Sequence, residues 1–408
     1  MNISQIRSHF PQLQEKLYGK ALVYLDNAAT SLRLDSAVEK WDQMSLRFNS
    51  NLHRAVHYTA AKATEEFEGA RKSVAEFLNA DSREIVFTSG ATQSLNLLAF
   101  CIGESGLLKE GDEILIAESE HHSDIVPWQM LAQRKGLKIK TIPVLDSGEI
   151  RMDILPSLIG PKTRICCVAQ VSNVLGIVNP VKEIARICHA AGCLLSVDGA
   201  QAVQHLKLDV KDLDCDFYSF SAHKMYAAPG VGVLYGRAEL LEQLPPYQGG
   251  GEMIESVKWS GSSYAGIPHR FEAGTQNISG VPAIKPAIEF LNSLFEDKES
   301  ADYQLDIKNL LLSELLKIEG LKLFGLPQDA SNKIPLFSFC VEGAHHEDLA
   351  LILDKMGIAL RSGQMCAEPL MDRFAVSGML RASFAPYNSM EEAKYFIESL
   401  RKAILMLK

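Results

Sequence analysis

The chain has 408 residues, of which 47% are hydrophobic and 22% charged, and its formal net charge is −9 at pH 7. Domains of roughly 100–200 residues would divide this length into two or three. Because nucleic acids and anionic membranes attract basic surfaces, the charge argues against either as the main partner. No apolar run reaches the ~18 residues of a membrane span, and Met1–Arg7 lacks the pattern of a secretory signal. We therefore expect a cytoplasmic protein.

The first two thirds of the chain alternate helical and strand-like patterns. Residues 62–79 predict an amphipathic helix, Glu84–Thr88 predicts a strand, and a Ser-Gly turn then opens an apolar helix from Thr92 to about Phe100. Further strands are predicted at Ile114–Ala117, Ile165–Ala169, Leu194–Val197, Phe217–Phe220 and Val231–Tyr235, with a helix at 181–191. Near-continuous apolar strands separated by helices predict a mostly parallel sheet covered on both faces.

The character of the sequence changes after about residue 290. Helical patterns at 302–318 and 390–406 flank strand-like segments near 335–341 and 357–361, which predicts a smaller α+β unit. We expect a large domain over 20–290 and a small domain formed by 1–19 and 291–408.

The eight cysteines are predicted to be reduced, because a long chain without a secretory signal is a poor candidate for disulfides. Six of them lie in apolar stretches such as 164–169, where cysteine acts as a small hydrophobe. Cys188 and Cys193 have no companion pair, so we expect no zinc site. Cys366 differs, because Arg361–Pro369 contains turn-forming glycine and proline and few apolar residues.

Ligands of open α/β sheets bind beyond the carboxyl ends of the strands, and four marked segments fall at such positions. The first is Ser89–Gln93, between a predicted strand and a helix start. The backbone N–H groups at Ala91 and Thr92, with the Thr92 hydroxyl, are suited to a phosphate. An ordinary helix cap is the alternative interpretation.

The second and third segments carry a carboxylate and an amine. Asp198 directly follows a buried strand, where its charge needs a cation or several donors; a helix N-cap is the alternative. Lys224 follows another apolar strand and is placed to form a Schiff base, with Ser221 and His223 as phosphate donors. A lone lysine after a strand is usually a solvated loop residue. The pair together indicates pyridoxal phosphate, whose ring nitrogen Asp198 would keep protonated.

The fourth segment is Glu120–Asp124, shortly after a predicted strand. An imidazole at this position is suited to stack on an aromatic cofactor and exchange protons. Two adjacent histidines, His121 and His122, also raise the possibility of a metal. Neighbouring side chains on an extended chain point apart, however, and no third ligand is evident, so we expect no metal site.

Seven motifs occur in one order along nearly the whole chain: Tyr24–Thr30, Glu120–His122, Val171–Gly176, Val197–Gln201, Ser221–Lys224, Phe271–Thr275 and Leu380–Ser383. Together they resemble the class V aminotransferase group, and specifically the SufS/CsdA-type (group II) cysteine desulfurases. The resemblance implies the fold of type I pyridoxal-phosphate transferases, with a mainly parallel seven-stranded sheet, and a homodimer.

The resemblance also implies roles for individual residues. Lys224, Cys366 and His121 match the catalytic residues, and Asn173, Arg361 and Arg381 match or adjoin those that bind substrate. The residues that match cofactor ligands are Ala91, Thr92, His121, Asn173, Asp198, Gln201, Ser221, His223, Lys224 and Thr275, the last reaching the phosphate from the other subunit.

The activity that the resemblance implies converts L-cysteine to L-alanine and leaves a persulfide on Cys366. A small acceptor protein would then take the sulfur for iron–sulfur cluster assembly. Two segments depart from the family pattern. Gln364 and Met365 precede Cys366, where the subgroup usually has histidine directly before the cysteine, and Met225–Gly230 lacks the usual glycine-proline-threonine order.

Three alternatives remain open. A selenocysteine lyase shares the site and acts on L-selenocysteine. A kynureninase or simple aminotransferase needs no thiol on this loop, so Cys366 argues against both. A degenerate homologue with only a binding role is disfavoured because Lys224, Asp198 and Arg381 are all present.

Overall fold

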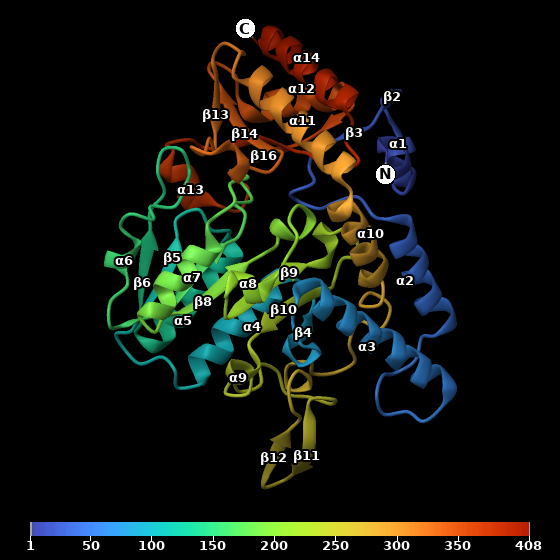
Figure 1. Ribbon diagram of the computed structural model, residues 1–408, viewed down its shortest axis with the longest axis vertical. Coiled ribbons are helices and arrows are strands. Elements are labelled where there is room, and N and C mark those ends of the chain that lie inside the picture. The colour runs from blue at the N-terminus through green and yellow to red at the C-terminus, as the bar shows by residue number, and fades with distance from the viewer. Residues whose placement is uncertain (1, 408) are drawn as a thin grey trace.

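The computed structural model describes residues 2–407 and has a central seven-stranded sheet with a smaller α+β unit at one end (Figure 1). In spatial order the strands are β4 (Ile85–Thr88), β10 (Gly232–Gly236), β9 (Phe217–Ser221), β8 (Leu194–Asp198), β7 (Thr163–Ala169), β5 (Glu113–Ala117) and β6 (Lys138–Ile142). Strand β10 runs antiparallel to both of its neighbours, and the other pairs are parallel. The predicted mainly parallel sheet is confirmed.

Both faces of this sheet are buried, which explains its near-continuous apolar strands. Successive side chains of a strand point to opposite faces, so Ile114 and Ile116 join one core while Leu115 and Ala117 join the other. The helices whose buried residues join the first core include α4 (Ala91–Glu104) and α5 (Val126–Lys135). Those that join the second include α3 (Tyr58–Leu78), α7 (Val181–Ala190) and α10 (Ile284–Glu296).

The smaller unit is built on an antiparallel sheet in the order β13 (Leu321–Phe324), β14 (Leu336–Val341), β17 (Met379–Ser383) and β16 (Arg361–Gly363). It has its own apolar core, shared with helices α11 (Lys298–Leu315), α12 (His346–Lys355) and α14 (Met390–Leu407). A short parallel pair, β3 (Val23–Tyr24) with β15 (Ile358–Ala359), brings the 23–30 segment beside β17. This pairing positions one wall of the site described below.

The remaining elements are short or peripheral. They are α1 (Ile3–Ser8), α2 (Asp35–Arg47), α6 (Leu155–Leu158), α8 (Val210–Leu213), α9 (Ala238–Leu241), α13 (Glu368–Arg373), and the hairpins β1 (Lys16–Leu17) with β2 (Lys20–Ala21) and β11 (Ile254–Lys258) with β12 (Gly261–Tyr264). The β11–β12 hairpin projects from the end of the molecule opposite the smaller unit (Figure 1).

Most predicted elements lie within a few residues of those observed. The helix expected at 302–318 is α11, which begins and ends earlier, and the strand expected at 357–361 is two short strands, β15 and β16. The longer elements that the sequence patterns missed include strands β6, β13 and β17 and helices α2, α5, α10 and α12. The division into domains at residues 19 and 290 stays a prediction. Within the predicted 1–19 segment, the ring of Phe10 packs against the rings of Tyr226, Phe290 and Tyr387.

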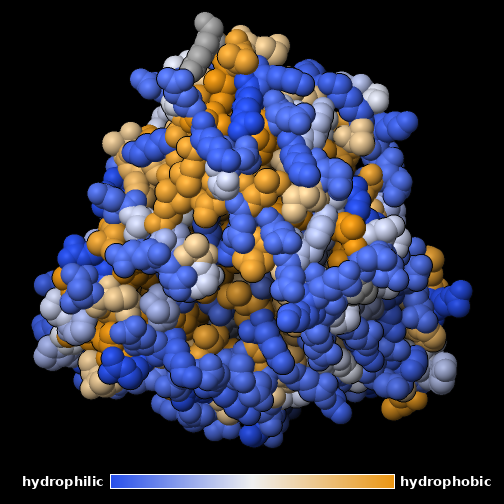
Figure 2. Space-filling model, turned by 45° about the horizontal axis from the view of Figure 1, so that its top comes forward, coloured by the Kyte–Doolittle hydropathy of each residue, from blue (hydrophilic) through white to orange (hydrophobic). Residues whose placement is uncertain are grey.

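Hydrophilic side chains cover most of the face shown in Figure 2, with apolar residues in separate groups between them. Within residues 2–407, no helix combines the length and apolar character required to cross a bilayer.

Candidate active site

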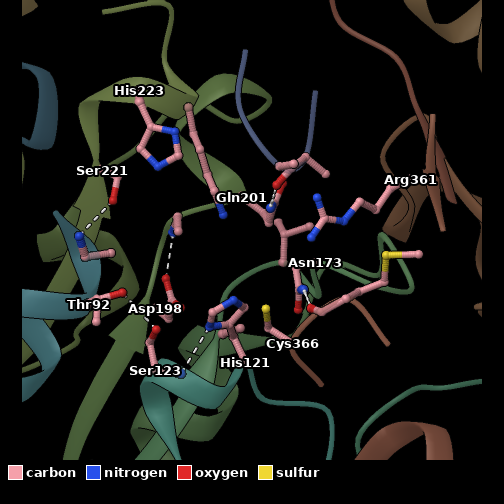
Figure 3. A pocket seen from close by; sticks show the side chains of 18 of the residues that line it. Thr92, His121, Ser123, Asn173, Asp198, Gln201, Ser221, His223, Arg361 and Cys366 are labelled. Carbon is pink, nitrogen blue, oxygen red and sulfur yellow. Dashed lines mark hydrogen bonds between the residues drawn. The ribbon is translucent and has the colours of Figure 1, made fainter. Parts of the chain in front are cut away.

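A cavity of about 330 Å³ lies at the carboxyl ends of the parallel strands, where the smaller unit meets the large sheet. Every predicted site residue except Thr275 lines it, and Figure 3 shows how these side chains converge. The predicted residues in its wall are Ala91, Thr92, His121, Asn173, Asp198, Gln201, Ser221, His223, Lys224, Arg361, Cys366 and Arg381. The remaining lining residues are Ala28, Ala29, Ser123, Ala169, Val171, Ala200 and Met365.

The sheet brings the carboxylate and the amine together. Asp198 is the last residue of β8 and pairs in register with Ser219 of the neighbouring strand β9, whose end leads directly to Lys224. Parallel strands end at the same edge of a sheet, so two residues 26 positions apart in sequence face one cavity. The position of each residue directly after a predicted strand was therefore sufficient to predict that Asp198 and Lys224 share one site.

Burial changes the protonation of both groups. Asp198 is 7% exposed and one carboxylate oxygen accepts a hydrogen bond of 2.8 Å from the Ala200 N–H. Burial raises the pKa of Asp198, while the charge of Lys224 opposes that rise. Burial also lowers the pKa of Lys224 to about 8; Asp198 partly offsets this effect and Arg381 adds to it. With this pKa about a tenth of the Lys224 amine is unprotonated at pH 7, and this is the nucleophilic form.

Backbone and hydroxyl donors gather at the start of α4. The Ala91 N–H donates to Ser221 Oγ at 2.7 Å, and the hydroxyl oxygens of Thr92 and Ser123 are 2.9 Å apart. The helix start is brought against β10 by a close backbone approach, since a Cβ on Gly232 would lie 2.4 Å from the Gly90 Cα. A long helix N-terminus surrounded by hydroxyl groups is suited to a phosphate.

His121 faces the cavity from the 3-10 turn that follows β5. Its Nδ1 accepts a hydrogen bond of 3.1 Å from the Ser123 N–H, which places the proton of the neutral ring on Nε2. Burial, with the nearby charge of Lys224, lowers the pKa of His121 to about 4. The imidazole is therefore neutral at physiological pH and free to lie against an aromatic ring.

Two guanidinium groups form the opposite wall. Arg361 and Arg381 are paired in register across β16 and β17. Arg381 is 3% exposed and donates to the Asn173 carbonyl at 2.9 Å and to an Asp26 carboxylate oxygen at 3.1 Å. Its Nε–H has no partner within the described residues, so this side chain retains a donor. The two charges make this wall suited to a carboxylate.

Asp26 was missed as a site residue, although it lies in a motif singled out in the sequence. Burial raises its pKa and Arg381 counteracts that effect. The sequence contains no local signal for this contact, because it depends on the β3–β15 pairing between distant segments.

Two buried carboxyl groups were also missed. Glu120 and Asp124 are fully buried, and each has one oxygen without a partner among the described residues. Burial raises the pKa of both well above the usual range, and the charge of Asp198 adds to the effect. Burial therefore disfavours the charged form of both groups, whereas at Asp198 the charge of Lys224 opposes that effect.

The thiol of Cys366 is exposed at the cavity wall, whereas six other cysteines are buried and Cys340 is half-buried. Met365, at the position where the family usually has histidine, is 6% exposed and packs into the large core. Both residues have a φ of 55°, an unusual conformation for residues other than glycine. The Met365 carbonyl accepts a hydrogen bond of 2.8 Å from Asn173 Nδ2.

Thr275 lies outside this cavity. It is exposed and lines a second cavity of about 240 Å³ with His53, Arg54 and Gln276 among others. Beside this second cavity, ring nitrogens of His53 and His269 and a carboxylate oxygen of Glu68 lie within 4.8 Å of one another. Glu68 already accepts hydrogen bonds from Arg71.

The match to known proteins is extensive. Residues 23–396 match the model of the aminotransferase class-V family. The chain belongs to this family. It is 41% identical over 409 aligned residues to a probable cysteine desulfurase of Vibrio cholerae, which covers 100% of both chains. It is also 41% identical to a cysteine desulfurase of Dickeya dadantii, covering 98% of this chain and 96% of that one.

Solved structures agree with this assignment. The cysteine desulfurase CsdA from Escherichia coli, in an S-sulfonic acid form, superposes with a TM-score of 0.91 at 38% identity over 100% of both chains. The apo cysteine desulfurase from Thermococcus onnurineus NA1 gives a TM-score of 0.92 at 35% identity, covering 100% of this chain and 99% of that one. The resemblance noted in the sequence and the predicted fold class are confirmed.

Proposed function

We propose that the protein is a pyridoxal-phosphate-dependent cysteine desulfurase, which converts L-cysteine to L-alanine and retains the sulfur as a persulfide on Cys366. One observation carries the proposal: an exposed thiol faces the same cavity as a half-buried lysine with a lowered pKa and a buried aspartate. The names of the relatives described above support the same activity.

The donor set fits pyridoxal phosphate. Lys224 would hold the aldehyde carbon, Asp198 the ring nitrogen, and the neutral His121 would lie against the ring. Asn173 and Gln201 would bind the ring oxygen and its surroundings. The phosphate would be held by the α4 N-terminus at Ala91 and Thr92 with Ser221 and His223. When bound, the cofactor withdraws electrons from the substrate Cα and so weakens the bond from Cβ to sulfur.

The chain's own groups would perform the remaining steps. Arg381, assisted by Arg361, binds the substrate carboxylate. Lys224 moves a proton at Cα, since its lowered pKa lets it accept and return one near neutral pH. Cys366 attacks the substrate sulfur as a thiolate, the form that is competent as a nucleophile. The bond from Cβ to sulfur breaks, a sulfur–sulfur bond forms and Cβ gains a proton, so the balance requires no external oxidant.

Assembly and sulfur delivery extend this proposal. We propose a homodimer in which the exposed Thr275 reaches the phosphate bound by the partner subunit. The persulfide would pass to a small acceptor protein for iron–sulfur cluster assembly in the cytoplasm. Deep burial of the thiol would hinder such transfer, and Cys366 is exposed.

The test is incubation of the purified protein with L-cysteine, measuring alanine and locating any added sulfur atom by mass spectrometry. We expect one equivalent of alanine for each persulfide on Cys366. Cys366→Ala is expected to keep the bound cofactor and lose sulfur transfer, and Lys224→Ala to lose both. Cys340→Ala is the matched thiol control. Full desulfurase activity in Cys366→Ala would refute the persulfide role, and activity confined to selenocysteine in that variant would favour a selenocysteine lyase.

A further inference from the structure

The loop that carries the thiol is held in an unusual shape. Met365 and Cys366 both have a φ of 55°, in the left-handed region that favours glycine. Two consecutive residues in this conformation persist only where surrounding contacts enforce it. The contacts around this loop therefore determine where the thiol stands.

His122 supplies two of these contacts, one to the cysteine itself and one to a residue two positions after it. Its backbone N–H donates to the Cys366 carbonyl at 2.8 Å. Its side-chain Nε2 accepts a hydrogen bond of 3.0 Å from the Glu368 N–H, the first residue of α13. The ring therefore carries its proton on Nδ1, and the residue spans the loop from Cys366 to the helix that follows.

The neighbouring residue faces the other way. His121 lines the cavity and packs beside the proposed cofactor position, and its ring centroid is 6.3 Å from that of His122. Figure 3 shows the His121 and Cys366 side chains, which both line this cavity. One dipeptide thus touches the cofactor side of the site through His121 and the thiol loop through His122. The distance between the two reacting parts depends on this short rigid connection.

We infer that His122 is a positioning residue, which clamps the Cys366 loop so that the thiol stands at a fixed distance from the substrate sulfur. The inference rests on the proposed desulfurase function and deepens it. Cofactor binding and the proton shift at Cα depend on other residues, so loss of the clamp slows sulfur transfer alone. A small misplacement of a reacting group is sufficient to cost a large factor in rate.

Three substitutions test the side-chain contact. His122→Gln can present its amide oxygen near the position of Nε2 and accept from the Glu368 N–H. His122→Asn is polar but too short to reach it, and His122→Ala removes the acceptor. We expect the alanine and asparagine variants to lose at least about tenfold in kcat for L-cysteine, with cofactor absorbance and the apparent affinity for L-cysteine unchanged. The glutamine variant recovers most of the loss.

A second measurement is independent of turnover. The rate at which iodoacetamide alkylates Cys366 in cofactor-free protein reports how the loop presents the thiol. We expect the alanine and asparagine variants to change this rate at least severalfold and the glutamine variant to match the wild type. His345→Ala is the control, because His345 similarly accepts from a backbone N–H at the start of α12 without lining the cavity.

Equal kcat and equal alkylation rates in the asparagine and glutamine variants would overturn the inference, whether or not the alanine variant folds. Loss of cofactor binding in parallel with activity would also overturn it, because that result indicates a general collapse of the site. Failure of the wild-type protein to produce alanine from L-cysteine refutes the desulfurase proposal instead. The alkylation result then still decides whether His122 positions the thiol.

Discussion

A buried ion pair joins the Phe271–Thr275 motif to helix α3. Arg71 of α3 is 2% exposed and Glu272 is 3% exposed, and their two hydrogen bonds are 2.7 and 2.8 Å long. The same carboxylate accepts a 2.7 Å bond from the Phe87 N–H of edge strand β4. Burial alone would raise the pKa of Glu272, yet Arg71 holds it below its usual range. The substitution Glu272→Gln removes the charge with little change in shape.

The expected loss of stability follows from this geometry. Breaking a buried ion pair by removing one partner costs about 3–5 kcal/mol, because the other charge stays buried. Since the less buried Glu68 still accepts from Arg71, we expect the lower end, about 3 kcal/mol. With 408 residues, the unfolding entropy is about 0.9 kcal/mol per kelvin if the chain unfolds as one unit, so the melting temperature should fall by about 3–4 °C.

Calorimetry of the wild type and the Glu272→Gln variant measures this difference directly. Glu314→Gln is the matched control, because Glu314 pairs with Arg401 and Lys317 at the surface, where such pairs contribute about 0–1 kcal/mol. A melting temperature for Glu272→Gln within 1 °C of the control, at a similar enthalpy, would refute the argument that this variant leaves the buried charge of Arg71 uncompensated.

Three other predictions concern protonation. Reloading of cofactor-free protein with pyridoxal phosphate should accelerate with pH around a midpoint of about 8, because burial lowers the pKa of Lys224 to that value; a midpoint near that of free lysine would contradict this. Asp124→Asn should change kcat by less than about twofold, since burial already disfavours the charged form of Asp124, whereas Asp198→Asn should cost about 100-fold or more; similar losses in both would disprove the assignment of the charge. Burial lowers the pKa of Lys333 from 10.5 to about 7. Between these two pH values the Lys333 amine is protonated in the unfolded chain but not in the folded chain. The stability of Lys333→Met relative to wild type should therefore rise by up to about 4 kcal/mol as pH falls from 10 to 7, and a difference independent of pH in paired denaturant titrations would exclude this.

The elements predicted correctly are those whose burial is evident from the apolar residues of the element itself. Strands β7, β8 and β9 are covered on both faces, so their apolar runs stand out in the sequence. Strand β6 lies at the sheet edge, and its Lys138–Ile142 segment is only partly buried and contains two lysines. Strand β17 is fully buried but contains Arg381, a charge that interrupts the apolar pattern. Local hydrophobicity therefore identified central strands and missed these two.

The site divides in the same way. Asp198 and Lys224 were predictable together, because each directly follows a strand and parallel strands end at one edge. The contacts of Arg381 with Asp26 and of Cys366 with His122 join segments separated by 355 and 244 positions in the chain, and nothing in either segment specifies its partner.

The sequence by itself determined the chemistry of this protein: an amine and a carboxylate after apolar strands, a thiol in a polar turn, and the order of seven motifs. Only the tertiary structure decided the protonation of these groups and the position of the thiol. Both depend on burial and on contacts between distant segments, and neither property belongs to any single stretch of chain.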